Sequence, residues 1–367
     1  MIVLGVNGWM ERSHDAAACL IAGERIVAMA EEERFIRQKY SLDKLPLNAV
    51  AFCLKQAKIT PDDIDVIAWG WDFPLIYSLH GREFPYKTKD LNELLFPRKY
   101  YPRKRKLIPV EFVSHHLSHA ASVYCARPDE EPICLAIVDG SSEDRSISIY
   151  RGQEGMIEMI RDYPMQISPG FFYEGACRYL GFTSWQAGKL MGLACYGEPL
   201  PFQGWRFENG EFSGPFSGMR LTANGLLDWE EEIVVEWVRI FESRWGARKK
   251  PAYDFPISEC FFRPTLKFSA RDKNIAASFQ VELERIYSAV IQEGMRLTGL
   301  KKVGLAGGVS LNCSANGMLL DSLMIDRLDI QPAAGDSGVA IGAAALMLGK
   351  IPPRLLETPF LGPGFAA

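Results

Sequence analysis

The sequence predicts an α/β fold of two similar lobes, because the same order of elements occurs twice along the chain. Three short apolar runs near the N-terminus predict three strands, and three runs after residue 132 predict three more. Each group of three is followed by a helical pattern, then a strand, a helix, and another strand that leads into a helix. Strands that alternate with helices are typical of α/β proteins. We therefore expect a duplicated βββαβα unit.

In the first half, apolar runs predict strands at 2–8, 16–21 and 26–30, and Gly23 marks the turn between the last two. The later elements expected there are a helix at 47–58, a strand at 66–70, and a strand followed by a helix within 110–126. The second half repeats this order with strands at 133–140, 146–150 and 156–160, a helix at 275–299, a strand at 303–306, and a strand and helix within 328–348.

These elements predict three parts of the chain. We expect a first lobe at 1–130, a second lobe at 131–350 with an insertion at about 200–271, and a tail or linker remnant at 351–367. The insertion contains four of the eight tryptophans, and an amphipathic pattern predicts a helix at 230–245. Packing explains Trp237 and Trp245, while recognition of an acceptor is the alternative role of this insertion.

Composition excludes several classes of protein. The 367 residues are 48% apolar and 23% charged, which is ordinary for a globular protein. A net charge of -4 argues against general binding to nucleic acids or membrane surfaces. We see no apolar run long enough to span a bilayer and expect residues 1–8 to be a strand, with no signal peptide. The eight cysteines are scattered without a C-x-x-C pair, so we expect reduced thiols in a cytoplasmic protein.

Three of the five histidines lie within residues 114–120, Ser-His-His-Leu-Ser-His-Ala. Ser114 is a plausible N-cap for a helix, on which His115 and His119 would share one face. Such a pair is able to hold one metal ion, but imidazoles at a helix start are also common hydrogen-bonding groups. His116 would point about 100 degrees away from His115, so we expect a supporting or structural role for it.

A duplicated βββαβα unit resembles the actin, hexokinase and Hsp70 superfamily, in which two lobes close on a nucleotide. Pseudo-twofold symmetry would then bring two further residues to the histidine pair. Asp139 ends a predicted strand, and Asp336 precedes the predicted C-terminal helix. Each alone would be an ordinary turn or N-cap residue. Together with His115 and His119 they predict a four-ligand site that suits Fe(II), Mn or Zn.

Glycine pairs mark the expected nucleotide side of the cleft. Gly307 and Gly308 follow an apolar strand, where paired glycines let the backbone approach a ligand closely. Gly335 and Gly338 flank Asp336 and would leave room for phosphates at a helix start. The alternative for the first pair is a tight turn between strand and helix. The sequence contains no P-loop and no G-x-G-x-x-G motif.

Taken in order, a series of motifs resembles one family, the O-carbamoyltransferases of the nodulation, cephamycin and tobramycin type. They are Gly5-Val6-Asn7, Ser13-His14-Asp15-Ala16-Ala17, Ala30-Glu31-Glu32-Glu33-Arg34-Phe35 through Lys39, the histidine cluster 114–120, Val138-Asp139-Gly140, Phe172-Tyr173-Glu174, Leu180-Gly181-Phe182, the stretch 188–197 with Lys189, Gly307 through Asn312 to Cys313, and Gly335-Asp336-Ser337-Gly338. The match covers most of the chain and is closest to the Kae1-like N-terminal domain of that family.

The resemblance implies a reaction. Carbamoyl phosphate and ATP give carbamoyladenylate, and the carbamoyl group then moves to a hydroxyl of a small acceptor in natural-product biosynthesis, with a metal, typically iron, touching the phosphate. His14 would serve as the base near neutral pH. Lys39, with Arg34, would hold carbamoyl or phosphate oxygens. Glu174 and Lys189 would bind the cofactor or form the wall of the cleft, and Asn312 would lie beside the nucleotide.

The chain departs from the family after Leu361-Gly362-Pro363, where relatives continue into a YrdC-like domain that makes the adenylate. We expect either a truncated sequence or a separate adenylate-forming partner. The isolated chain would then transfer carbamoyl from supplied carbamoyladenylate and make little itself.

Other functions fit the sequence less well. Threonylcarbamoyl transfer to tRNA would favour a basic face, which the net charge disfavours. A sugar or acetate kinase would not need the histidine pair, and a non-catalytic scaffold would not need intact ligands. The basic, aromatic segment 98–106 is either a solvated loop or a patch for an anionic acceptor or partner.

Overall fold

The computed structural model describes residues 1–127, 129–221, 228–250, 267–322, 324–352 and 354–362. Its first sheet has the strand order β3-β2-β1-β4-β5. The strands are β1 (Ile2–Asn7), β2 (Ala17–Ala22), β3 (Arg25–Glu31), β4 (Val66–Trp69) and β5 (Val110–Phe112). Strand β1 pairs antiparallel with β2 and parallel with β4, so the sheet is mixed.

The second sheet has the order β12-β11-β6-β7-β8, which repeats the first. Its strands are β6 (Ile133–Val138), β7 (Arg145–Gln153), β8 (Met156–Pro164), β11 (Lys302–Ala306) and β12 (Arg327–Ile330). Strand β6 pairs antiparallel with β7 and parallel with β11, as β1 does with β2 and β4. The predicted duplication of βββαβα lobes is therefore confirmed, and with it the actin- and hexokinase-like fold.

Helices complete each unit. Helix α2 (Leu47–Ala57) follows the first three strands, and α9 (Ala270–Thr298) occupies the equivalent position in the second unit. Helix α9 begins at a capping box, in which Ser269 Oγ accepts from the Asp272 amide and the Asp272 carboxylate accepts from the Ser269 amide. It ends at Gly299, whose left-handed φ of 69° closes the helix.

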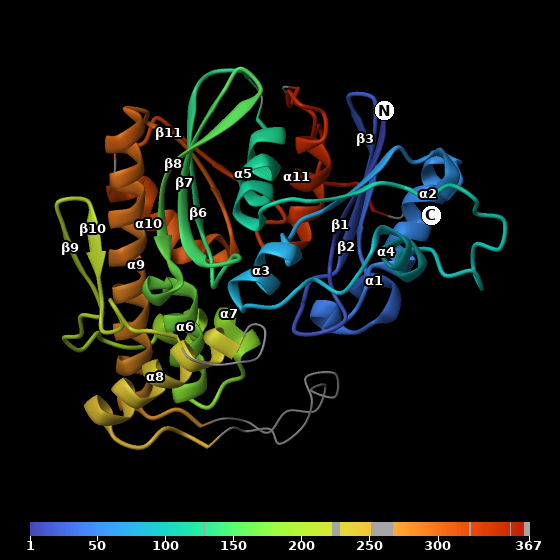
Figure 1. Cartoon of the computed structure of the whole chain (residues 1–367). Coiled ribbons are helices and arrows are strands. Elements are labelled where there is room, and N and C mark those ends of the chain that lie inside the picture. The colour runs from blue at the N-terminus through green and yellow to red at the C-terminus, as the bar shows by residue number, and fades with distance from the viewer. Residues whose placement is uncertain (128, 222–227, 251–266, 323, 353, 363–367) are drawn as a thin grey trace, which may run out of the picture.

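Two central helices, α5 (His115–Cys125) and α11 (Val339–Leu346), lie side by side between the sheets (Figure 1). Helix α5 packs on β6 and β11 of the second sheet, and α11 packs on β1, β2 and β4 of the first. Small residues permit this close approach, because a Cβ at Gly342 would overlap the carbonyl oxygen of Ser118. A Cβ at Gly5 would likewise overlap the carbonyl oxygen of Ala340. Each unit thus contributes its last helix to the other sheet.

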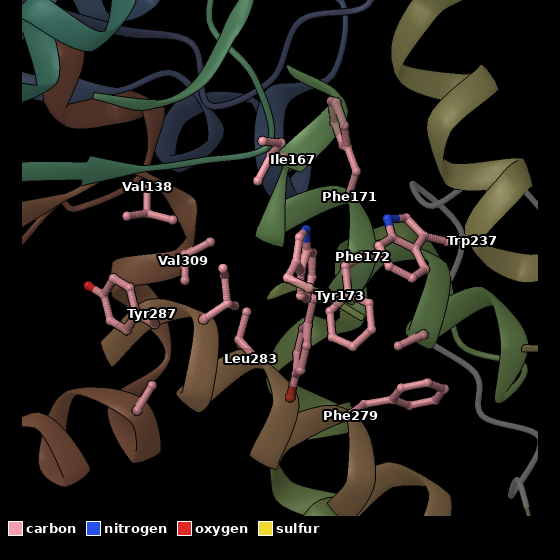
Figure 2. Packing of buried hydrophobic residues seen from close by; sticks show 14 of the residues in the cluster. Val138, Ile167, Phe171, Phe172, Tyr173, Trp237, Phe279, Leu283, Tyr287 and Val309 are labelled. Carbon is pink, nitrogen blue, oxygen red and sulfur yellow. The ribbon is translucent and has the colours of Figure 1, made fainter. Parts of the chain in front are cut away.

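Between β8 and α9 the second unit carries additional elements. They are α6 (Pro169–Tyr179), α7 (Ala187–Ala194), the hairpin β9 (Arg206–Glu208) and β10 (Glu211–Ser213), and α8 (Asp228–Trp245). The predicted helix at 230–245 is confirmed as α8. Aromatic side chains join α6, α8 and α9, and Figure 2 shows Phe172 close to Trp237 and Phe279. These buried rings fix the position of α6 beneath the loop that follows β6.

The first lobe carries α1 (Glu33–Ile36), α3 (Phe73–Leu79) and α4 (Thr88–Leu95), and α10 (Cys313–Ser322) follows β11 in the second. The basic segment 98–106 follows α4 and is anchored by Asp62, whose carboxylate accepts from the amides of Arg105 and Lys106. Arg98, Lys99 and Tyr100 are exposed.

The seven cysteines in the described part of the chain are free thiols, and Cys260 lies outside it, as does part of the predicted insertion. Within the same residues, no helix combines the length and the apolar character needed to cross a bilayer.

Candidate metal centre and cavity

The structure brings the four predicted metal ligands together. One donor atom from each of His115, His119, Asp139 and Asp336 lies within 4.8 Å of the others, and all four residues are buried. His119 Nε2 is 3.1 Å from Asp139 Oδ2, and both imidazole Nε2 atoms are 3.5 Å from Asp336 Oδ1. In the described residues this is the one such cluster of potential ligands.

The position of each ligand follows from the secondary-structure element that carries it. His115 and His119 are four residues apart in the first turns of α5, so their rings share one face. Asp139 directly follows β6, and Asp336 begins the turn that leads into α11. Gly307 follows the neighbouring strand β11 with φ at 92°, and a Cβ there would overlap the carbonyl oxygen of Val138. The close approach of these strand ends therefore requires glycine at 307.

His115 is held in one orientation. Its Nδ1 lies 3.1 Å from the carbonyl oxygen of Gly70, to which it donates in the tautomer that leaves Nε2 facing the carboxylates. The ring of Trp71 stacks on the imidazole with centroids 3.7 Å apart and planes at 24°. His116 turns the other way and places Nδ1 2.7 Å from Ser148 Oγ on β7, outside the ligand cluster.

Three of the four ligand residues have an unsatisfied donor atom, which tests whether the site fits a metal. His115 Nε2, His119 Nε2 and Asp139 Oδ2 are buried without an aligned hydrogen-bond partner among the described residues. Buried polar atoms without partners are costly and rare, so several at one point indicate a missing ligand. Two imidazole nitrogens and two carboxylates form a donor set that suits Fe(II), Mn or Zn. The residues therefore fit a divalent transition metal.

Electrostatics within the cluster are strongly coupled. Burial alone lowers the pKa of His119, but the nearby carboxylates of Asp139 and Asp336 outweigh this effect and raise the pKa to about 9. Burial raises the pKa of Asp336, yet His14 and the two ligand histidines hold it well below its usual value. By contrast, burial lowers the pKa of His116 to about 3, so this imidazole is neutral. Without a metal, the protonated His119 offsets part of the negative charge of the two carboxylates.

His14 lies beside the ligand cluster, as predicted. Its Nδ1 is 3.0 Å from Asp15 Oδ2, and its Nε2 is 3.7 Å from Asp336 Oδ2. Burial lowers its pKa, but the carboxylates of Asp336 and Asp15 more than compensate and raise the pKa to about 10. The Asn7 side chain donates to the carbonyls of both His14 and Asp15 and so fixes this turn. The Trp185 ring meets the imidazole edge-on, with centroids 4.7 Å apart.

A cavity of about 690 Å³ opens between the lobes above this cluster. Its walls come from the turn after β1, the loops after β4 and β6, helices α6 to α8, and the turns after β11 and before α11. The predicted site residues that line it are His14, Asp139, Glu174, Gly308, Asn312, Gly335 and Asp336. The volume is sufficient for a small-molecule ligand.

Other predicted residues lie elsewhere. Lys39 and Lys189 are exposed and do not line the cavity. Gly338 is buried, and a Cβ there would overlap the carbonyl oxygen of Ala333, so packing accounts for this glycine. Arg34 pairs with Glu31 at the surface.

Two of the lining residues already have partners within the chain. Glu174 forms an ion pair with Arg178 at 2.7 Å. Asn312 exchanges amide hydrogen bonds with Gln280 at 2.9 and 3.0 Å. Both therefore act first as fixed parts of the wall.

Sequence reasoning missed several residues of this site. Trp71 and Trp185 pack on the two functional imidazoles, and Asp15 orients His14. Glu143 accepts a hydrogen bond from the amide of His115 and takes the capping role predicted for the Ser114 side chain, which makes no such bond. A signal existed for Asp15, which directly follows His14. The contacts of the others join segments far apart in the chain.

Comparison with known proteins shows the family to which the chain belongs. The family model described as "Carbamoyltransferase N-terminus" matches residues 73–345. The nodulation protein NolNO of Sinorhizobium fredii is 31% identical over 99% of this chain and 53% of its own length. An uncharacterized Synechocystis protein, sll1178, is 30% identical over 93% of this chain and 56% of its own. The chain thus spans about half the length of these relatives.

Two solved structures are similar in fold. One is component A of the (R)-2-hydroxyglutaryl-CoA dehydratase of Acidaminococcus fermentans, which is 15% identical to this chain with a TM-score of 0.47. That match covers 94% of this chain and 96% of the other. The ROK hexokinase of Thermus thermophilus is 15% identical, with a TM-score of 0.43, over 94% and 97%. The family match covers the loop after β6, the helix that carries both histidines, and the turn at Asp336. The chain therefore belongs to the carbamoyltransferase family, whose N-terminal region it contains.

Proposed function

We propose that this chain transfers a carbamoyl group from carbamoyladenylate to a hydroxyl of a small acceptor in natural-product biosynthesis. The observation that carries this proposal is the group of four buried donor atoms at the wall of a cavity that also contains His14. Membership of the carbamoyltransferase family supports the transferred group. The hydroxyl acceptor and the adenylate donor are the finer parts of the proposal.

His115, His119, Asp139 and Asp336 would hold a divalent metal, with Fe2+ favoured and Mn2+ or Zn2+ as alternatives. When bound, such a metal supplies positive charge for the donor phosphate and the carbonyl oxygen. The hydrogen bond from His115 to Gly70 keeps Nε2 free for this purpose. Burial of the cluster limits competition from water for the same donor atoms.

His14 would accept the proton of the acceptor hydroxyl. The acceptor oxygen forms a bond to the carbamoyl carbon, the bond from that carbon to the phosphate oxygen breaks, and AMP leaves with the electron pair. Asp15 fixes Nδ1 of His14, so Nε2 faces Asp336 at the cavity wall. Once Asp336 and Asp139 serve as ligands, their charge no longer retains a proton on His14, and the imidazole is able to act as a base.

The glycine turns would accept the adenylate. Gly308 and Gly335 line the cavity, and the absence of a side chain at these positions would let the adenylate approach the backbone closely. ATP and carbamoyl phosphate are the proposed precursors of the donor. Because the relatives are about twice as long, the adenylate-forming step is proposed for a YrdC-like polypeptide, either further along the same protein or separate.

The direct test supplies carbamoyladenylate to the purified chain loaded with ferrous iron under anaerobic conditions. Co-encoded pathway intermediates and simple polyols serve as acceptors, and mass spectrometry detects the added carbamoyl group. We expect carbamoylated product with wild-type protein and at least about 100-fold less with His14→Gln. Glu158→Gln, an exposed change on β8 outside the cavity lining, is the control and should react like wild type. Equal rates for wild type and His14→Gln would contradict the assigned base.

A further inference from the structure

Glu143 is a buried carboxylate, only 5% exposed, in the loop that follows β6. Its Oε1 accepts from the amide of Asp72 at 3.0 Å and from the amide of His115 at 2.9 Å. Its Oε2 accepts from Ser114 Oγ at 3.5 Å. The three donors come from two segments of the first unit, whereas Glu143 belongs to the second. One side chain therefore ties three separate segments of the chain together.

The segments that Glu143 joins all contain or contact His115. The carbonyl of Gly70 fixes its Nδ1, the ring of Trp71 stacks on it, and the amide of Asp72 shares the Glu143 oxygen with the amide of His115 itself. The loop that carries Glu143 also carries Asp139, four residues earlier, whose carboxylate faces His115 and His119. The position of His115 relative to Asp139 thus depends on the bonds to Glu143.

The chemistry of a helix start explains why a carboxylate occupies this place. His115 is the first residue of α5, where amides have no partner within the helix and the helix dipole is positive. The Ser114 side chain lies at the N-cap position but does not cap, so the charged oxygen of Glu143 satisfies the amide instead. A charged acceptor for several donors forms stronger bonds than a neutral one.

We propose that Glu143 is the positioning residue of the metal centre, which sets His115 against Asp139 by capping α5 from the opposite lobe. This inference rests on the proposed metal site. Glu143 does not line the cavity and is not a ligand in the cluster. Loss of its two acceptor oxygens would free the start of α5 and residues 70–72, and with them the His115 imidazole. The ligand cluster would then lose one well-oriented nitrogen.

The test compares Glu143→Ala, Glu143→Gln and Glu158→Gln with wild type, using Co2+ as the probe. Glu158 is an exposed residue of β8 and provides the matched control. We expect Glu143→Ala to weaken Co2+ binding by about 10- to 100-fold in calorimetry and to change the visible Co2+ spectrum. Glu143→Gln should restore affinity to within about threefold, because its amide oxygen replaces Oε1 as acceptor for both backbone donors.

A second readout does not require a metal. Hydrogen–deuterium exchange of the peptide spanning 113–120 should be faster in metal-free Glu143→Ala than in wild type, and near wild type in Glu143→Gln. Glu143→Asp, which keeps the charge but is too short to reach both amides, should resemble Glu143→Ala. Wild-type affinity and exchange in both Glu143→Ala and Glu143→Asp would overturn the inference. Failure of wild type to bind Co2+ would instead contradict the proposed metal site, while the exchange data still decide the role of Glu143.

Discussion

At the scale of single residues, the ligand cluster is the feature that sequence reasoning located best. The spacing of His115 and His119 predicts one helical face, and α5 confirms it. Asp139 follows the first strand of the second unit, and Asp336 precedes the helix of that unit that is equivalent to α5, so the topology that the sequence predicts brings both to the histidine pair. Glu143 and Trp71 were not predictable, because their roles depend on contacts between lobes that no local pattern encodes.

Replacement of the ligand His119 should abolish tight metal binding, whereas the same replacement at the neighbouring His116 should not. We expect His119→Gln to reduce Fe2+ or Co2+ affinity by more than about 100-fold, since a direct ligand contributes more than an outer-shell partner. His116→Gln is the control, because His116 bonds to Ser148 outside the cluster. Calorimetric titration measures both. Equal losses in the two variants would argue against the assigned ligand set.

Metal binding should release protons at neutral pH. In the metal-free chain, Asp139 and Asp336 raise the pKa of His119 to about 9, so its imidazole is charged at pH 7. An imidazole that binds a metal must be neutral, so metal binding displaces this proton. Affinity should therefore increase by up to about tenfold per pH unit for each displaced proton, and level off above the raised pKa. Titrations in two buffers of different ionisation enthalpy count the protons. Binding without proton release would contradict this charge balance.

At the scale of elements, apolar runs between turns predict every strand of both sheets, and α2, α5, α8, α9 and α11 lie where the sequence indicates. A helix was also expected between β4 and β5, where α3 and α4 lie, whereas α1, α6 and α7 were not predicted. Tertiary packing rather than a local sequence pattern decides these helices. Lys39 and Lys189 were predicted to bind the substrate or cofactor because they lie in family motifs, but both are exposed and lie outside the cavity lining. Membership of a motif does not determine the direction of a side chain.

The contact between α5 and α11 should be sensitive to a single methyl group. Gly342→Ala should lower the free energy of unfolding by about 3 kcal/mol or more, because the new Cβ would overlap the carbonyl of Ser118 in a packed core. Gly317→Ala provides the control, since it lies on α10 with open space around the added atom, and should be neutral or stabilising by up to about 1 kcal/mol. Chemical denaturation measures both, and similar values for the two would contradict the packing.

At the scale of the whole molecule, the first turn of α8 connects the lobes at the cavity. Arg12 and His80 of the first lobe contact this turn: Arg12 pairs with Asp228, and the His80 ring stacks on Trp229 with centroids 4.0 Å apart. Within the second lobe, Ser141 donates to Glu230 at 2.7 Å. The insertion thus belongs to the wall of the cavity as well as to the aromatic core. Its place in the cavity wall is consistent with a role in acceptor recognition, while the rings of Trp237 and Trp245 serve packing.

Loss of the stacking between His80 and Trp229 should increase the mobility of the start of α8 in the cavity wall without reducing metal affinity. We expect Trp229→Ala to increase hydrogen exchange in the first turns of α8, because the stacking partner of His80 is lost. Metal affinity should remain within about threefold of wild type, as changes at sites without shared partners are independent. Unchanged exchange in α8 would show that the stack with His80 does not hold this helix in place.

The central claim is that one metal ion joins both halves of the duplicated fold at the wall of the cavity between the lobes. Anomalous X-ray diffraction at the iron edge, from crystals grown anaerobically with Fe2+, tests it most directly. The account predicts one strong peak within coordinating distance of Nε2 of His115, Nε2 of His119 and the carboxylates of Asp139 and Asp336. A peak elsewhere, or none at this position with iron in excess, would contradict it.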